Sequence, residues 1–307
     1  MPHHFQNPQI MNSRILSRIG LLLALLIFLS NCCQAQGRMK VILTGGTDIQ
    51  DIGQGCQVSL TLMEDAFKYI GLMTNMEIDF TYCKGSDFNK KHIIDVVNGV
   101  QKDIYDAIVF FNTSHGFNYQ NTPSKHTFFV AHPTAMGSMS QNGLTTHGVS
   151  LEKEIYKPLR AKGAPILLVF SESCNMVVNM EAPAIYKTMN PNISSRMKEL
   201  FMSGSAHIIS SSSQYGQYSY TDDESGGIYV NALLHAMNDV TTCADEANWS
   251  KVMSLTKKYV NKYAEDLEEG QDPIFDEEDA TPIGLDESDQ PKKGNGGYIS
   301  SGIKLRN

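Results

Sequence analysis

The sequence predicts an α/β fold in which helices cover both faces of a mostly parallel sheet. Three observations lead to this prediction. Strand-like and helix-like segments alternate along most of the chain. Two strand-like segments, residues 106–116 and 164–174, are apolar enough to be buried on both faces. Both of them end in polar residues, at the edge of the sheet where α/β folds place their chemistry.

The first half of the chain predicts three strands and two helices. Residues 39–46 (MKVILTGG) form the first strand, and residues 55–71 carry apolar side chains at helical spacing. Residues 76–83 (MEIDFTYC) form the second strand, and residues 89–101 the second helix. The third strand is the apolar segment 106–116 (DAIVFFNTSHG).

The second half continues the alternation with one interruption. Residues 126–133 form a small hairpin element, and residues 150–163 a helix that Gly163 can end. The fourth strand, residues 164–174 (APILLVFSESC), is as apolar as the third. The remaining elements are an irregular stretch over 175–204, a fifth strand over 206–213, and helices over 226–237 and 248–267.

Composition excludes several classes of function. A chain of 307 residues can hold one large domain or two small ones. Its net charge of −8 argues against a nucleic-acid partner, because phosphate contacts need a basic surface. The sequence has neither GxGxxG nor a Walker lysine, no CxxC pair, and no EF-hand spacing of acids. We therefore expect no cofactor and no metal.

The first 35 residues predict a signal peptide. Arg14 and Arg18 precede the apolar stretch IGLLLALLIFLS, and a cleavage-like site follows near Ala35. The apolar stretch is too short to span a bilayer comfortably, so we expect export, to the outside or the periplasm, with no integral membrane anchor after processing. Two alternatives stay open, a lipoprotein modified at Cys32 and an uncleaved membrane anchor.

The end of the chain differs in character from the rest. From Glu265 to Asp289 there are many acids and neither Lys nor Arg. We therefore predict a folded domain over residues 36–267, followed by a solvated, partly disordered acidic tail over residues 268–307. Of the cysteines left after cleavage, Cys56 and Cys83 are expected to be core thiols, and at most one disulfide is expected.

The two apolar strands end in residues that can act together. The third strand ends in His115-Gly116, and the fourth in Ser173-Cys174. Adjacent parallel strands end at the same edge of a sheet, so the thiol should lie beside the imidazole. A thiol is partly ionised near neutral pH, and a neighbouring imidazole raises its reactive fraction. The backbone N–H groups of Gly116 and Cys174 are suited to form an oxyanion hole.

These strand ends resemble the motifs of the caspase–metacaspase superfamily of cysteine peptidases, whose relatives include legumain and the gingipains. The resemblance runs from about Met39 to Leu267, and includes the DIGQGC segment after the first strand and the GGIYVNALLHAM helix. It implies a caspase-like three-layer α/β/α sandwich and a peptide or protein substrate. Metacaspases differ in having His-Ser-Gly after the nucleophile, where Asn175 and Met176 stand here, and an Asp in place of Ser59.

The resemblance also implies roles for individual residues. It makes His115 and Cys174 a catalytic dyad and gives Gly116 a place in the oxyanion hole. It places Glu172 in the pocket that selects the substrate residue before the scissile bond. It also implies that three serines border the substrate cleft, namely Ser210, Ser211 and Ser212.

Glu172 further predicts what is cut. Side chains alternate along a strand, so Glu172 and Cys174 point in the same direction. A carboxylate in the cleft favours a guanidinium or ammonium partner, which predicts cleavage after Arg or Lys. The alternative is that backbone donors hold Glu172 and that it never meets substrate.

The sequence thus predicts a secreted cysteine endopeptidase. The alternative is a catalytically silent caspase-like module that binds or regulates other proteins. A serine esterase or amidase would need a GxSxG elbow, which the sequence does not contain.

Overall fold

The computed structural model describes residues 37–119, 124–133, 140–173, 176–177, 193–243, 246–267 and 270–278. The chain divides into two compact units, Met1–Gln36 and Gly37–Asn307, and the description below concerns the second. The predicted signal peptide, the predicted nucleophile Cys174 and the chain after residue 278 lie outside the described residues.

A six-stranded sheet forms the centre of the domain, in the order β2-β1-β3-β7-β9-β12. Its strands are β1 (Arg38–Gly45), β2 (Glu77–Lys84), β3 (Ala107–Ser114), β7 (Ile166–Ser173), β9 (Ala206–Ser211) and β12 (Ile274–Glu278). The pairs from β2 to β9 are parallel, and β12 is antiparallel to β9. All eight residues of β3 and of β7 are buried, as the apolar character of these segments predicts.

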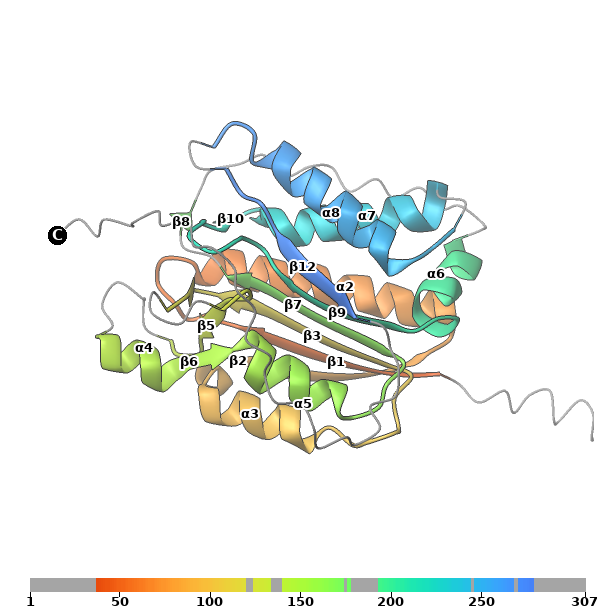
Figure 1. The fold of residues 1–307 in the computed structure, drawn as a ribbon, viewed down its shortest axis with the longest axis horizontal. Coiled ribbons are helices and arrows are strands. Elements are labelled where there is room, and N and C mark those ends of the chain that lie inside the picture. The colour runs from red at the N-terminus through yellow and green to blue at the C-terminus, as the bar shows by residue number, and fades with distance from the viewer. Residues whose placement is uncertain are drawn as a thin grey trace, which may run out of the picture. The chain divides into compact units, whose positions relative to one another are not determined.

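Helices cover both faces of this sheet, which confirms the predicted α/β/α sandwich (Figure 1). The helices packed in the core of one face are α2 (Gly53–Thr74), α6 (Ile193–Met202), α7 (Ile228–Cys243) and α8 (Trp249–Tyr263). The other face carries α3 (Lys90–Gly99), the π-helical segment η3 (Leu151–Tyr156) and α5 (Lys157–Arg160). The short elements η1 (Gly85–Asp87) and α4 (Gln141–His147) complete the described helices.

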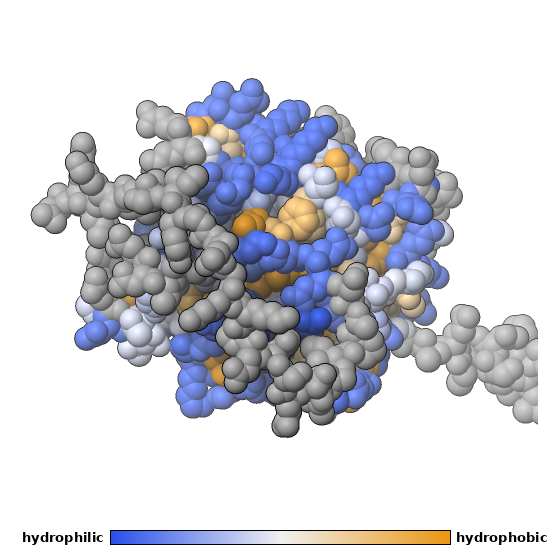
Figure 2. All heavy atoms as spheres, viewed as in Figure 1, coloured by the Kyte–Doolittle hydropathy of each residue, from blue (hydrophilic) through white to orange (hydrophobic). Residues whose placement is uncertain are grey.

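The strands feed two hydrophobic cores because their side chains alternate. Val41 and Leu43 of β1 pack in the core on the α2 face, and Ile42 between them packs in the core of the opposite face. Helix α2 contributes residues at helical spacing, such as Met63 and Phe67. On the face seen in Figure 2, the described residues are mostly hydrophilic. No helix of the described residues is both long and apolar enough to cross a membrane.

Two small sheets continue the chain from the carboxyl edge of the central sheet. The first contains β4 (Gly116–Phe117), β5 (Phe128–Val130) and β6 (Gly148–Ser150). The second contains β8 (Met176–Val177), β10 (Tyr220–Asp222) and β11 (Gly226–Gly227). β4 follows closely after β3, and β8 follows closely after β7. Each small sheet therefore contains a strand that closely follows one of the two strand ends with the predicted chemistry.

Two predicted segments differ in detail from the structure. The stretch 175–204 was expected to be irregular, but its last part is helix α6. The buried residues Met197, Leu200 and Phe201 recur at helical spacing, a signal that the prediction missed. The helix expected over 150–163 begins as the π-helical segment η3, and Gly163 follows with a φ of 83°.

The acidic tail also departs from its prediction, because its first part is strand β12 at the edge of the sheet. Its acids are matched by basic side chains from distant parts of the chain. Asp276 forms ion pairs with Lys125 and His126, and Glu278 with Arg160. The sheet therefore extends beyond residue 267, where the sequence placed the end of the domain.

Candidate active site

His115 lies directly after β3, at the carboxyl edge of the central sheet. The residue is buried, with 3% of its surface exposed. Its backbone carbonyl accepts a hydrogen bond from the Val130 N–H at 2.9 Å and another from the Ser114 hydroxyl at 3.1 Å. The fold thus fixes the backbone of His115 at the edge where α/β proteins place their chemistry.

Gly116 lies against the end of β7. A Cβ atom on Gly116 would lie 2.3 Å from the Cβ of Ser173 and 2.9 Å from the hydroxyl oxygen of Thr127. No other residue fits at this position without moving one of these neighbours. The His-Gly pair of the sequence therefore has a steric reason, because glycine lets the chain after His115 pass close to β7.

Strands β3 and β7 stay in register up to the predicted catalytic residues. Ser114, the last residue of β3, pairs with Ser173, the last residue of β7. In the sequence, His115 follows the first of these serines and Cys174 follows the second. The prediction that both strands end at the same edge is confirmed, while the role of Cys174 stays a prediction.

A buried polar network joins these strand ends. The side-chain amide of Asn112 donates to the hydroxyls of Ser114 and Ser171, both at 3.1 Å. The Thr44 hydroxyl, from β1, donates to the amide oxygen of Asn112 at 3.1 Å. The hydroxyls of Ser171 and Ser173 lie 2.9 Å apart. Because these buried groups are hydrogen-bonded to one another, they fix the relative positions of the ends of β1, β3 and β7, next to His115.

The imidazole of His115 faces a carboxylate that the sequence analysis missed. Its Nε2 lies 3.2 Å and 3.1 Å from the two carboxylate oxygens of Asp51. Asp51 lies between β1 and α2, and 49% of its side chain is exposed. The available signal was its place in the chain, because β1 pairs with β3 and ends at the same edge. Asp51 also opens the DIGQGC segment.

Glu172 does not line an open pocket. It is fully buried, and its carboxylate accepts from the Val230 N–H at 2.9 Å and the Thr113 hydroxyl at 3.2 Å. Ser59 provides a third hydrogen bond. A Cβ atom on Gly227 would lie 1.9 Å from a carboxylate oxygen, so the backbone of β11 covers the group. In this structure protein donors hold Glu172, as the alternative expects, and its contact with substrate stays a prediction.

Burial controls the protonation of this interior. Burial raises the pKa of Glu172, against the effect of its hydrogen bonds. Burial also raises the pKa of the Cys56 thiol to about 12, and that of the Cys83 thiol to about 12. Both thiols are free and buried, so the prediction that they are core thiols is confirmed. A raised pKa favours the protonated thiol, so neither cysteine is suited to act as the nucleophile.

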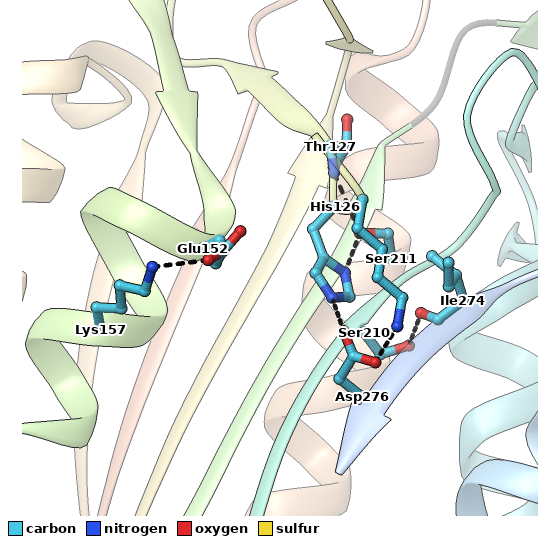
Figure 3. A network of polar contacts seen from close by, with 9 residues as sticks. His126, Thr127, Glu152, Lys157, Ser210, Ser211, Ile274 and Asp276 are labelled. Carbon is cyan, nitrogen blue, oxygen red and sulfur yellow. Dashed lines mark hydrogen bonds and ion pairs between the residues drawn. The ribbon is translucent and has the colours of Figure 1, made fainter. Parts of the chain in front are cut away.

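Two of the serines expected at a substrate cleft are buried and form hydrogen bonds inside the domain. Ser210 is buried, and its hydroxyl accepts a hydrogen bond from the Tyr229 hydroxyl at 2.7 Å. Ser211 is buried, and its hydroxyl lies 3.3 Å from Nδ1 of His126. Figure 3 shows the His126 ring between Ser211 and the carboxylate of Asp276. These contacts connect β9 to its neighbours, and the predicted place of both serines at a substrate cleft stays a prediction.

Ser212 is also buried, but it contacts the end of β7. Its backbone N–H donates to the Ser171 carbonyl at 2.9 Å, and its hydroxyl accepts from the Ser173 N–H at 3.3 Å. Of the three predicted serines, Ser212 therefore lies next to the residue that precedes Cys174.

Comparison with protein families agrees with this geometry. The family model described as "Caspase domain" matches residues 49–281, well over half of the chain. The chain belongs to the caspase-domain family. The match includes Asp51, His115 and Glu172, and it extends past β12. A comparison with curated proteins gives no significant match.

Membership of the family establishes the fold and the general class of activity. The mixed, mostly parallel sheet with helices on both faces is the caspase fold. A caspase domain implies a cysteine peptidase with proteins as its general substrates. Within this caspase domain, the structure brings together His115, Gly116 and Ser173, and adds Asp51 to them.

Proposed function

We propose that this caspase domain is a cysteine endopeptidase in which Cys174 is the nucleophile and His115 the general base. The pairing of Ser114 with Ser173 carries the proposal, because the two catalytic residues follow these serines directly in the sequence. The position of the buried imidazole at the sheet edge and the family match support the same assignment.

The proposed reaction has two halves. His115 takes the thiol proton, and the sulfur of Cys174 attacks the carbonyl carbon of the scissile bond. Backbone N–H groups of Gly116 and Cys174 stabilise the oxyanion. When the C–N bond breaks, His115 protonates the leaving amine and the acyl group stays on sulfur as a thioester. Water then gives a proton to His115 while its oxygen attacks the thioester. The C–S bond breaks, the acid product leaves, and the proton returns to the thiolate.

Alanine substitutions test the dyad. We expect Cys174→Ala and His115→Ala each to lower kcat/KM for a peptide substrate by at least about 100-fold, because nucleophile and base act as a unit. Circular dichroism should show that both variants remain folded. Cys83→Ala is the matched control, since it removes a buried thiol of β2, a strand that β1 separates from β3. Turnover by Cys174→Ala at the parental rate would overturn the assignment.

Cleavage after Arg or Lys is the finer part of the proposal. Glu172 places a carboxyl group behind the end of β7, but the Gly227 backbone covers it. The preference therefore requires the Gly226–Gly227 segment to move aside, so that a basic side chain can replace the protein donors. Matched peptides with Arg, Lys, Asn or Asp before the scissile bond test it. A preference for Asp contradicts the proposal, and a preference for Asn indicates a legumain-like pocket.

One observation favours the alternative, a catalytically silent caspase domain that binds or regulates other proteins. The carboxylate expected to recognise substrate has none of its surface exposed. A thiol-directed activity probe separates the two functions. Labelling at Cys174 supports the peptidase, whereas a folded protein that neither reacts with the probe nor cleaves peptides supports the binding module.

Export remains part of the proposal and rests on residues 1–35, which the structure does not describe. N-terminal sequencing of the mature protein tests it. A mature N-terminus near Gln36 supports cleavage and release. A lipid-modified Cys32 supports the lipoprotein, and an intact apolar segment in the membrane fraction supports an anchor.

A further inference from the structure

We propose that Asp51 is the positioning residue of His115. Its carboxylate accepts the proton on Nε2, which leaves Nδ1 as the base that serves the nucleophile. The two carboxylate oxygens lie 3.2 Å and 3.1 Å from Nε2, within hydrogen-bonding distance. This inference rests on the proposed function, because it assigns Asp51 a part in the reaction of Cys174 and His115.

The chemistry of the two groups fixes the tautomer. An ionised carboxylate has acceptors and no donor, so its contact with Nε2 requires the proton to be on that nitrogen. A neutral imidazole carries one N–H, and its other nitrogen is an acceptor. With Nε2–H held by Asp51, the lone pair of Nδ1 can take the thiol proton. The other tautomer would already carry a proton on Nδ1 and could not act as the base there.

The loop that carries Asp51 is firmly held. Ile49 and Ile52, on either side of it, are 2% and 1% exposed. The Ile49 N–H donates to the Gly46 carbonyl at 3.1 Å, and the Gly53 N–H to the Ile49 carbonyl at 2.7 Å. Anchored backbone on both sides restricts where the carboxylate can go, so little ordering is needed to aim it at the imidazole.

The same loop is bonded to the strand that carries His115. The Gly46 N–H donates to the carbonyl of Thr113, in β3, at 3.0 Å. The loop of Asp51 and the residue His115 are therefore both attached to the hydrogen-bonded ends of β1 and β3, which restricts their relative positions. Because both residues are attached to the same pair of strands, the Asp51 carboxylate can keep the His115 ring in one orientation through the catalytic cycle.

A carboxylate that only stabilised the loop could show the same distances, so the test needs a readout that loop stability does not change. Asp51→Ala removes the acceptor, and Asp51→Asn keeps an amide oxygen that can accept the same hydrogen bond. Asp48→Ala is the matched control. Asp48 lies in the same loop with the same charge, but its carboxylate lies beside Thr47, 3.3 Å from its hydroxyl.

We expect Asp51→Ala to lower kcat at least about tenfold with little change in KM, because the base is misoriented while the substrate contacts remain. Asp51→Asn should recover part of the lost rate, and Asp48→Ala should keep the parental kcat. Thermal unfolding of each variant shows whether stability changes in parallel. An Asp51→Ala protein with the parental kcat, or a loss of kcat that Asp48→Ala reproduces, overturns the inference.

The tautomer can be measured without turnover. Nitrogen-15 NMR of histidine-labelled full-length protein reports which ring nitrogen of His115 is protonated, and His115→Gln assigns its signals. We expect Nε2–H in the parent and a smaller population of it in Asp51→Ala. A parent with Nδ1–H, or an unchanged tautomer in Asp51→Ala, overturns the inference.

The two proposals can fail separately. If Cys174→Ala keeps its activity, the proposed dyad is wrong, whatever the tautomer of His115. If Cys174→Ala is inactive while Asp51→Ala has the parental kcat, the dyad holds and the role of Asp51 is wrong.

Discussion

The Val230 N–H donates a 2.9 Å hydrogen bond to the Glu172 carboxylate from the first turn of α7. The first N–H groups of a helix have no partner within it, and its N-terminus attracts negative charge. The Thr113 hydroxyl donates to the same carboxylate from β3. Glu172, two residues before the predicted nucleophile, therefore connects the first turn of helix α7 to strand β3 of the central sheet.

This arrangement predicts that Glu172→Gln changes the pH dependence of stability. Burial raises the pKa of Glu172, so the folded protein keeps the carboxyl protonated to higher pH than the unfolded chain does. The stabilisation by this group is present below 4.5, the ordinary pKa of a glutamate side chain, and is lost as pH rises through the folded pKa. Gln keeps the shape and an oxygen for Val230. Urea unfolding should therefore show the variant gaining stability relative to the parent as pH rises above 4.5.

The control for this prediction is Glu277→Gln, which removes an exposed carboxylate on β12. We expect its difference in unfolding free energy from the parent to stay nearly constant over the same range. A Glu172→Gln protein that loses stability relative to the parent as pH rises would show that the buried carboxylate is held in its charged form.

Gly116→Ala should damage both stability and catalysis. The added Cβ would lie 2.3 Å from the Cβ of Ser173, so the ends of β3 and β7 must move apart. Overpacking of this kind costs about 1–3 kcal/mol, measurable by urea or thermal unfolding. We also expect a lower kcat/KM, because the displaced strand ends precede both catalytic residues.

Gly99→Ala provides the matched control at the end of α3. A Cβ atom there meets nothing within 4 Å, and alanine in a helix is more favourable than glycine. We expect it to be neutral or slightly stabilising. If Gly116→Ala behaves in the same way, the contact with Ser173 does not set the spacing of the strand ends.

The strands of the sheet could be predicted because each strand is marked by the residue pattern of its own short segment. The eight residues of β3 and of β7 are buried on both faces, and continuous apolar runs bounded by polar residues report this directly. The same runs locate His115 at the edge, because parallel strands end together. Helix α6 could also have been predicted, since its apolar residues recur at helical spacing.

What could not be predicted depends on partners that are distant in the sequence. The acids of β12 look like a solvated tail until Lys125 and Arg160 are known to face them. Strand alternation gives the direction of Glu172 but not what covers it, and the covering group is the backbone of Gly227. Asp51 reaches His115 through a loop whose path no periodicity encodes.

We expect peptidase activity to be independent of calcium. The interval 116–173 contains no Asp, and among its acids Glu152 pairs with Lys157 at 2.8 Å. Glu154 pairs with Lys90 at 2.9 Å. The remaining acid of the interval is the buried Glu172, so each acid is already engaged, whereas hard cations need several oxygen ligands. The measurement is the rate in excess chelator. A loss restored by calcium and not by magnesium would contradict the expectation.

His126 predicts a second, opposite pH dependence. It is buried between Ser211 and Asp276 (Figure 3), and the charges of Lys125 and Glu152 also act on it. Burial lowers its pKa, although the hydrogen bond and charge of Asp276 oppose this. The unfolded chain therefore binds a proton first as pH falls. The stabilisation by neutral His126 is present above 6.5, the ordinary pKa of a histidine side chain, and is lost as pH falls through the folded pKa.

His126→Gln removes this titration while keeping an amide that can hydrogen-bond in place of the ring. We expect the parent to lose stability relative to the variant as pH falls from about 7 to about 5, measured by urea unfolding. Burial also lowers the pKa of His147 and His207, but these groups titrate in both proteins and cancel in the difference. His92→Gln, at a partly exposed position in α3, is the control and should give a flat difference. Parallel curves for His126→Gln and the parent would mean that Asp276 compensates the burial of the ring. The contacts of His126 with Ser211 of β9 and Asp276 of β12 would then stabilise the fold equally at pH about 7 and about 5.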